Sequence, residues 1–180
     1  MSDPERGAIE ARIRVVPDWP KPGVSFKDLS GVLADPVAFG ACIRGLAAPV
    51  DGRGIDHVVG IEARGFPYGA ALAHHLGAGF IAMRKPGKLP GAVHARAYEL
   101  EYGTATLELH RDACTAGHRV VIVDDVLATG GTAEAAVHLV RETGAEVAGV
   151  LVVMDLPFLG GSERVRALGV PVHALLVDAG

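Results

Sequence analysis

Cysteine and aromatic residues are scarce in this chain of 180 residues, and neither sign of charge is in large excess. The two cysteines, Cys42 and Cys114, have no metal-like spacing, so we interpret them as core or incidental thiols. The formal net charge of −4 argues against a nucleic-acid-binding surface. No apolar run approaches a membrane span, and residues 1–6 lack the basic and apolar regions of a signal peptide. We therefore expect a cytoplasmic protein that binds neither nucleic acid nor membranes.

The composition is that of a globular protein, with 49% hydrophobic and 21% charged residues. The length favours one domain over residues 1–180, and there is no internal repeat or second-domain boundary. Ser2 and Glu5 have capping-box spacing and predict a helix over about residues 3–15. Residues 17–34 are rich in proline and predict an ordered irregular segment. Asp35 and Pro36 then predict the start of a second helix.

From residue 57 onward, strand-like and helix-like segments alternate. Strand-like runs cover residues 57–61, 80–83, 119–124, 147–154 and 172–177, and β-type runs cover residues 98–102 and 104–110. Helical patterns cover residues 67–76 and the stretch from Thr132 to near Gly144. Strands that alternate with helices predict an α/β fold with a mainly parallel sheet flanked by helices.

The most informative segment runs from Val120 to Thr132. An apolar strand ends there in Asp124 and Asp125, and a turn rich in glycine and threonine follows. Open α/β sheets bind ligands at the carboxyl ends of their strands, and charge at such an end costs desolvation energy unless it has a partner or a ligand. The turn lacks the Gly-Lys-Ser/Thr ending of a P-loop, so it suits one monophosphate. The carboxylates can hold ribose hydroxyls or the water shell of Mg²⁺.

Three other segments carry weaker signals, each with a purely structural alternative. Residues 62–66 place an arginine between small residues after a strand, which fits an anion site or a surface turn. Residues 84–88 hold three cations, which fit an anion-binding loop or a solvated surface. Residues 98–103 fit an exposed hairpin edge, and their pattern alone gives no reason to prefer a functional role. The residue pattern does not choose between these alternatives.

Residues 123–132 resemble the phosphoribosyl pyrophosphate signature of the type I phosphoribosyltransferases. Four further segments, residues 23–30, 62–66, 84–91 and 98–103, resemble the members of that family that use adenine. The resemblance extends from about residue 17 to 161. It implies an α/β core over residues 35–180, a small N-terminal helix and base-binding hood over residues 1–34, and a flexible catalytic loop.

The implied activity is purine salvage, in which the 5-phosphoribosyl group of phosphoribosyl pyrophosphate is transferred to adenine. AMP and pyrophosphate would be the products, and a homodimer the assembly. The implied cofactor is Mg²⁺, with no direct protein ligand, held through substrate and water near Asp124 and Asp125.

The resemblance also implies roles for individual residues. Glu101 would handle a proton near the purine, Tyr102 would form a wall of the active site, and Arg64 would act at the pyrophosphate. The other implied substrate-binding residues are Ala63, Gly65, Arg84, Lys85 and Lys88 for pyrophosphate; Asp124, Asp125, Ala128, Thr129, Gly130, Gly131 and Thr132 for ribose and its 5-phosphate; and Val24, Ser25, Phe26, Lys27 and Leu156 for the base. Two positions depart from the family pattern, because many relatives carry arginine in place of Lys27 and some in place of Pro86.

Two alternative functions stay open. The first is transfer to hypoxanthine, guanine or xanthine; relatives that use 6-oxopurines typically carry a lysine in the region of residues 150–163, which has none here, and this favours adenine. The second is a regulatory protein that senses phosphoribosyl pyrophosphate while it holds nucleic acid. Residues 1–34 are too short for a convincing DNA-binding module and the net charge has the wrong sign, so this alternative is less favoured.

Overall fold

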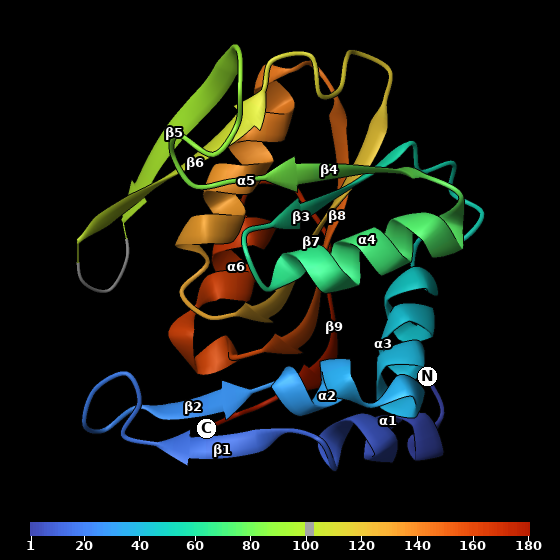
Figure 1. Ribbon diagram of the computed structural model, residues 1–180, viewed down its shortest axis with the longest axis vertical. Helices are drawn as coiled ribbons and strands as arrows, with labels where there is room; N and C mark the ends of the chain where they lie inside the picture. The colour runs from blue at the N-terminus through green and yellow to red at the C-terminus, as the bar shows by residue number, and fades with distance from the viewer. Residues whose placement is uncertain (100–102) are drawn as a thin grey trace.

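The structure, a computed structural model, describes residues 1–99 and 103–180. Its centre is a five-stranded sheet with helices on both sides (Figure 1). The strand order is β4-β3-β7-β8-β9, and every neighbouring pair is parallel. The strands are β3 (His57–Ile61), β4 (Gly79–Met83), β7 (Arg119–Leu127), β8 (Glu146–Asp155) and β9 (Val172–Val177). The predicted α/β class with a parallel sheet is confirmed.

Helices cover the two faces of the sheet in separate layers. One layer contains α1 (Asp3–Glu10), α3 (Pro36–Ala47) and α4 (Gly65–Leu76), and the other contains α5 (Gly131–Glu142) and α6 (Gly161–Arg166). In the central strand β7, Val121 and Val123 pack toward α3 and α4, whereas Val120 and Ile122 pack toward α5. All four are fully buried. The position of the carboxyl end of β7 is therefore fixed by packing on both faces.

The prediction of an irregular segment over residues 17–34 was wrong. An antiparallel hairpin of β1 (Arg14–Pro17) and β2 (Ser25–Asp28) occupies this region, followed by the short helix α2 (Ser30–Ala34). The prolines are compatible with a hairpin because Pro17 ends a strand and the others lie in the connection. The backbone N–H of Gly23 donates to Asp18 Oδ1 at 2.7 Å across that connection. Helix α1 also ends earlier than predicted, at Glu10.

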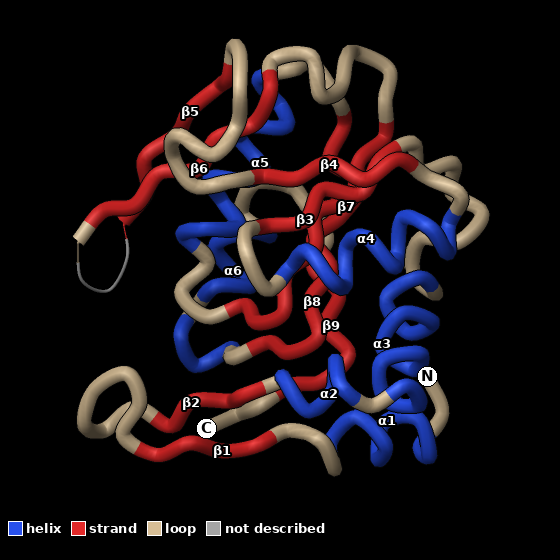
Figure 2. Tube along the Cα trace, viewed as in Figure 1, coloured by secondary structure: helices blue, strands red, loops and turns tan. Residues whose placement is uncertain are grey.

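A second hairpin lies beside α5, away from the first one (Figure 2). Its strands are β5 (Val93–Glu99) and β6 (Thr104–His110). Strand β6 matches the prediction, while β5 begins earlier than the predicted run of residues 98–102. The remaining short element is the 3₁₀ turn η1 (Pro157–Leu159). Within the described residues, no helix has the length and apolar character needed to cross a membrane.

Candidate active site

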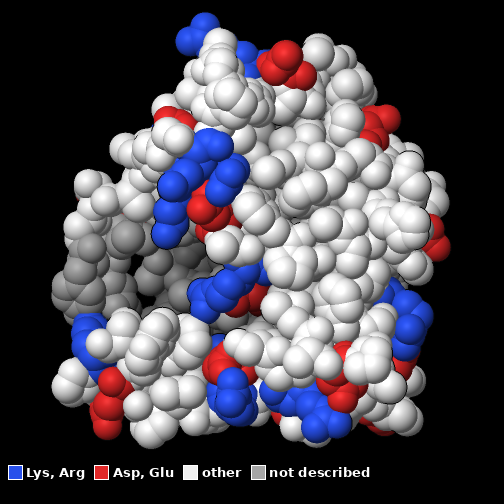
Figure 3. Space-filling model, viewed as in Figure 1, with Lys and Arg blue, Asp and Glu red and all other residues white. Residues whose placement is uncertain are grey.

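A cavity of about 400 Å³ opens at the carboxyl ends of β3 and β7. Its polar lining comes from Arg64, Asp124, Thr129 and Thr132, and its apolar floor includes Ile61 and two valines of β8. In Figure 3 the surface is hollowed to the left of centre, and Lys and Arg side chains gather at the rim of the hollow. This combination suits a ligand with an anionic group and hydroxyl groups.

The two adjacent carboxylates of β7 have different surroundings. Asp125 is 2% exposed, and its Oδ2 lies 3.0 Å from Arg64 Nε. Asp124 is half-buried, lines the cavity, and accepts a hydrogen bond from the Asp125 backbone N–H at 2.9 Å. Burial raises the pKa of both carboxyls; the charge of Asp125 raises the pKa of Asp124 further, whereas Arg64 opposes the shift at Asp125. Asp125 is therefore paired within the protein, while Asp124 presents its carboxyl group to the cavity.

The turn that follows β7 approaches the start of α6 closely. Gly130 has a φ of +80°, and a Cβ there would lie 2.8 Å from the Cα of Gly161. A Cβ on Gly161 would in turn overlap the carbonyl oxygen of Ala128. Residues 128–130 can therefore take this shape only because two glycine backbones touch. The turn leads into the N-terminus of α5, where the first backbone N–H groups have no partner inside the helix and attract anions.

Arg64 connects two regions that are far apart in the sequence. It stands at the start of α4, where Gly65 allows close packing, because a Cβ at Gly65 would lie 2.5 Å from the Val123 carbonyl oxygen. Its guanidinium pairs with Asp125 and also lies over the ring of Phe26, 5.3 Å from the centroid. Arg64 thus links the end of β7 with the N-terminal hairpin.

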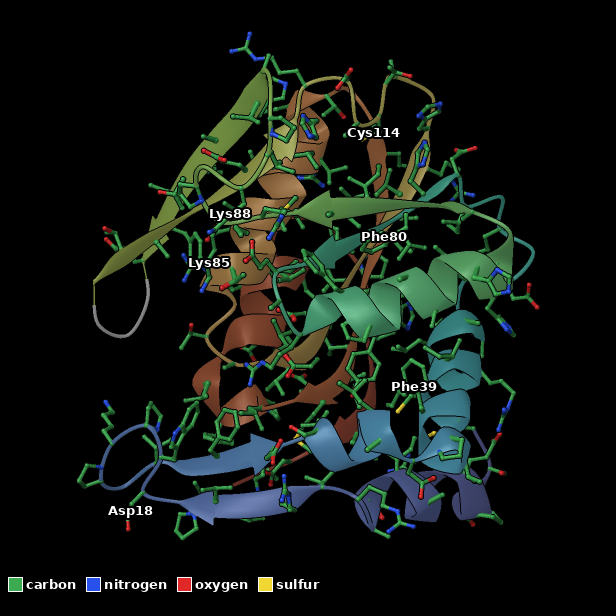
Figure 4. The ribbon with its side chains drawn as sticks, in the orientation of Figure 1. Asp18, Phe39, Phe80, Lys85, Lys88 and Cys114 are labelled. Carbon is green, nitrogen blue, oxygen red and sulfur yellow. The ribbon has the colours of Figure 1, made fainter. Side chains whose placement is uncertain are left out.

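The basic loop, residues 84–91, is organised by an acid that the sequence analysis did not select. Glu62 Oε2 lies 3.2 Å from Arg84 Nε and accepts the Lys85 backbone N–H at 2.9 Å. These two interactions, led by the Lys85 hydrogen bond, lower the pKa of Glu62. Arg84 is therefore engaged by Glu62, whereas the side chains of Lys85 and Lys88 are exposed beside the hairpin of β5 and β6 (Figure 4).

The predicted base-binding residues lie on β2 and after β8. Phe26 packs against Trp19 with ring centroids 4.2 Å apart, and Lys27 Nζ lies 2.8 Å from Asp178 Oδ2. Leu156 is half-buried, and its backbone N–H donates to the Leu127 carbonyl at 2.9 Å, which places it beside the end of β7. These residues are absent from the lining of the cavity. The structure brings the predicted ribose and phosphate residues together, and the hairpin joins them through the contact of Arg64 with Phe26.

Three residues near the site were missed by the sequence analysis. Gly161 could have been found, because two consecutive glycines follow a strand and a short turn. Glu62 could also have been found, because it directly follows a buried strand. Asp178 gave no signal. The predicted catalytic residues Glu101 and Tyr102 lie outside the described residues. The described part of the chain contains no group of three or more His, Cys, Asp or Glu that could hold a metal ion.

Comparison with known proteins identifies a family. The sequence profile of the phosphoribosyl transferase domain matches residues 35–164. The chain is 54% identical to an adenine phosphoribosyltransferase of Methylobacterium sp. (strain 4-46) over 169 residues, which is 94% of this chain and 93% of that protein. It is 50% identical to an adenine phosphoribosyltransferase of Rhodopseudomonas palustris (strain TIE-1) over 172 residues, 96% of this chain and 95% of that one.

Solved structures give the same result. The crystal structure of adenine phosphoribosyltransferase from Rhodothermus marinus superposes with a TM-score of 0.92 at 47% identity, covering 98% of this chain and 100% of that one. The Saccharomyces cerevisiae enzyme, solved with an imino-altritol bisphosphate and adenine, superposes with a TM-score of 0.90 at 36% identity. The aligned region covers 97% of this chain and 100% of the yeast chain.

Proposed function

Because the chain belongs to the phosphoribosyltransferase family, and its relatives are adenine phosphoribosyltransferases, we propose that it transfers the 5-phosphoribosyl group of phosphoribosyl pyrophosphate to adenine. AMP and pyrophosphate are the products, and the reaction salvages a free purine. The observation that carries the proposal is a carboxylate-lined cavity beside a helix N-terminus that is shaped by glycines. Phosphoribosyl pyrophosphate matches both features, because its ribose hydroxyls suit the carboxylate and its 5-phosphate suits the helix N-terminus.

The 5-phosphate binds to the turn of residues 128–132 and the N-terminus of α5. Backbone N–H groups and the hydroxyls of Thr129 and Thr132 donate to its oxygens. Asp124 accepts hydrogen bonds from the ribose hydroxyls, while Asp125 keeps Arg64 in place. Binding energy from the phosphate, remote from the reacting carbon, holds that carbon in register with the base.

The leaving pyrophosphate binds beside Arg64 and the basic loop of residues 84–91. Bond breaking at C1 develops positive charge on the sugar and negative charge on the leaving group. Arg64 and the exposed ammonium groups of Lys85 and Lys88 stabilise the latter. The exposed Ala63 offers its backbone to the pyrophosphate, and Gly65, packed against the Val123 carbonyl, keeps this segment close to the end of β7. Arg84 is held by Glu62, so its part is to shape the loop as well as to add charge.

The base binds between the hairpin and the segment after β8. Phe26 and Leu156 supply its apolar walls together with Val24, and the backbone groups of Ser25 and Lys27 read its edge. Glu101 handles the proton near the purine and Tyr102 closes the wall. Replacing Glu101 by Gln removes the ionisable group at constant size, so a fall in kcat tests that role.

Mg²⁺ is the proposed cofactor, held through substrate oxygens and water beside Asp124. The donor set fits, because a nearby cation stabilises two adjacent carboxylates whose pKa values are raised by burial. When bound, the ion supplies positive charge that neutralises the leaving pyrophosphate. Loss of activity on chelation, with recovery on addition of Mg²⁺, tests this assignment.

A homodimer is supported by the face formed by α4 and β4. Residues 65–83 contain no Asp, Glu, Lys or Arg, and this face is free of charge in Figure 3. Ala70 is exposed there, and Phe80 is 39% exposed. A charge at the exposed position, as in Ala70→Arg, is expected to convert the dimer to a monomer in sedimentation analysis.

The cytoplasmic location and the division into hood and core also stay predictions. Cell fractionation tests the location, and limited proteolysis tests the division.

The decisive experiment measures AMP formation from phosphoribosyl pyrophosphate with a panel of bases. Adenine is expected to give the highest kcat/KM. An equal or higher value with hypoxanthine, guanine or xanthine would overturn the choice of base, and absence of product with all of them would favour a protein that only senses phosphoribosyl pyrophosphate.

A further inference from the structure

The hairpin of β1 and β2 has few ways to hold its position on the core. Its two strands pack chiefly against each other, and their side chains are exposed or half-buried. In Figure 1 it extends along the lower edge of the molecule, beyond the sheet. Because this hairpin carries Phe26 and Lys27, the geometry of the proposed base subsite depends on individual side-chain links to the core.

Lys27 makes such a link to the C-terminal segment. Its Nζ lies 2.8 Å from Asp178 Oδ2, and the two side chains are 22% and 25% exposed. The pair is therefore partly shielded from solvent, where an ion pair is stronger than on an open surface. The hydrogen bond from Lys27 also lowers the pKa of Asp178, because it stabilises the charged form of the carboxyl group.

Asp178 is in turn fixed to the core beside the other wall of the subsite. Its backbone N–H donates to the Asp155 carbonyl at 3.0 Å, and its Oδ1 accepts the Gly180 N–H at 3.3 Å. Gly180 lies against the ring of Phe158 in η1. Since Leu156 directly follows Asp155, the chain of contacts runs from Lys27 through Asp178 to the segment that carries Leu156.

We propose that Asp178 is a positioning residue for the base subsite, which holds the hairpin at the correct distance from Leu156 through its ion pair with Lys27. This inference rests on the proposed function, because it concerns the base in that reaction. Asp178 is absent from the lining of the cavity, so it acts through Lys27. Without the pair, the hairpin occupies additional positions. The apparent affinity for the base then falls in proportion to the fraction of molecules whose hairpin is in the binding-competent position.

The first test is the variant Asp178→Asn, which keeps the shape and removes the charge. Its KM for adenine is expected to rise about two- to fivefold, the scale of a partly exposed ion pair, while kcat and the KM for phosphoribosyl pyrophosphate stay within about twofold. The matched control is Arg14→Gln, which breaks an ion pair of 2.6 Å with Asp28 inside the same hairpin. An unchanged KM for adenine in Asp178→Asn, or an equal rise in the control, would overturn the proposal.

A double-mutant cycle separates the link from a general loss of stability. Lys27→Gln is expected to reproduce the effect of Asp178→Asn, and the double variant to add nothing further. Lys27→Arg, which preserves the charge, is expected to retain most of the wild-type affinity for adenine. Additive effects, or a rise of both KM values together, would mean that Asp178 only stabilises the fold.

Hydrogen exchange provides a readout that does not depend on activity. Amides of residues 14–28 are expected to exchange faster in Asp178→Asn than in the wild type, with β7 and α5 unchanged. Unchanged exchange in the hairpin contradicts the link itself. If the wild type formed no AMP from adenine, the proposed function would fail, and the exchange experiment would still decide whether Asp178 holds the hairpin.

Discussion

The two halves of the proposed active site are held in place by different means. The phosphoribosyl side is formed by the end of β7 and the start of α5, where main chain packs on main chain and valines are buried on both faces. The base side is formed by a hairpin at the surface, which side chains connect to the core. Packing fixes the geometry of the proposed donor side, whereas a few polar and aromatic contacts hold the hairpin of the proposed base side.

The two sides therefore differ in how far a substitution there disturbs the rest of the fold. Alteration of the donor side disturbs the central strand and thus the fold. Alteration of the hairpin affects a region with few buried contacts, which is the kind of region that opens locally. The proposed donor side is therefore the rigid side of the site, and the proposed base side is the adjustable one.

The largest expected effect comes from neutralising the carboxylates of the rigid side. The double variant Asp124→Asn with Asp125→Asn removes the carboxylate that lines the cavity and the partner of Arg64. We expect kcat/KM for phosphoribosyl pyrophosphate to fall about a hundredfold or more. Calorimetric titration with this substrate checks the loss, with the exposed Asp51→Asn as control. Normal binding in the double variant would remove both residues from the site.

The next largest effect tests whether contact between backbones shapes the phosphate turn. Gly161→Ala places a methyl group against the Ala128 carbonyl, so the turn must shift. Overpacking of this kind costs about 1–3 kcal/mol, and we expect the KM for phosphoribosyl pyrophosphate to rise roughly tenfold with little change for adenine. The control is Gly7→Ala, because a Cβ at Gly7 meets nothing within 4 Å. An equal change in both KM values would show that the two sides are not independent.

A smaller effect is expected on the adjustable side. Phe26→Leu removes the ring that packs on Trp19 and under Arg64. Because stacking of a base on an aromatic side chain contributes about 1–3 kcal/mol, we expect the KM for adenine to rise about fivefold to tenfold. Phe39→Leu, on α3 and in contact with Tyr68, serves as the aromatic control (Figure 4). A larger effect on phosphoribosyl pyrophosphate than on adenine would contradict the division.

The smallest effect concerns stability and depends on pH. Burial raises the pKa of Asp124 above its ordinary value of 3.8 in the folded state, so the folded protein binds its proton more tightly than the unfolded chain. The stability associated with this proton is present at low pH and is lost as the pH rises through the folded pKa. Asp124→Asn should therefore raise Tm by about 2–4 °C at neutral pH, and the gain should disappear as the pH falls toward 4. Calorimetric scans at several pH values check this; a gain independent of pH would exclude the carboxyl as its source.

The sequence predicted best the features that depend on local periodicity. Strands β3, β6 and β9 have the predicted bounds, and Asp35 caps α3 through hydrogen bonds from Val37 and Ala38 of 2.9 and 3.0 Å. These succeed because an apolar run or a capping residue acts over a few neighbouring positions. Residues of one strand and the turn that follows it, such as Asp124 and Thr132, line the same cavity for a related reason, since chain connectivity keeps them near one another.

Long-range contacts could not be predicted in this way. The hairpin of β1 and β2 was missed because three prolines obscured a short alternating pattern, and its pairing joins residues on either side of them. The contacts of Glu62 with Arg84 and of Lys27 with Asp178 depend on which strand ends lie side by side. A single sequence does not report that order, because charges alone do not identify their partners.

The contact between Trp19 and Phe26 also gives this molecule an optical property. Trp19 is the single tryptophan of the chain, is half exposed, and lies on the hairpin that the base is expected to meet. Tryptophan emission from the intact protein therefore originates from this one hairpin, and the sheet and its helices contribute none. A change of emission on addition of adenine, compared with addition of phosphoribosyl pyrophosphate, would follow the arrival of the base in unlabelled wild-type protein.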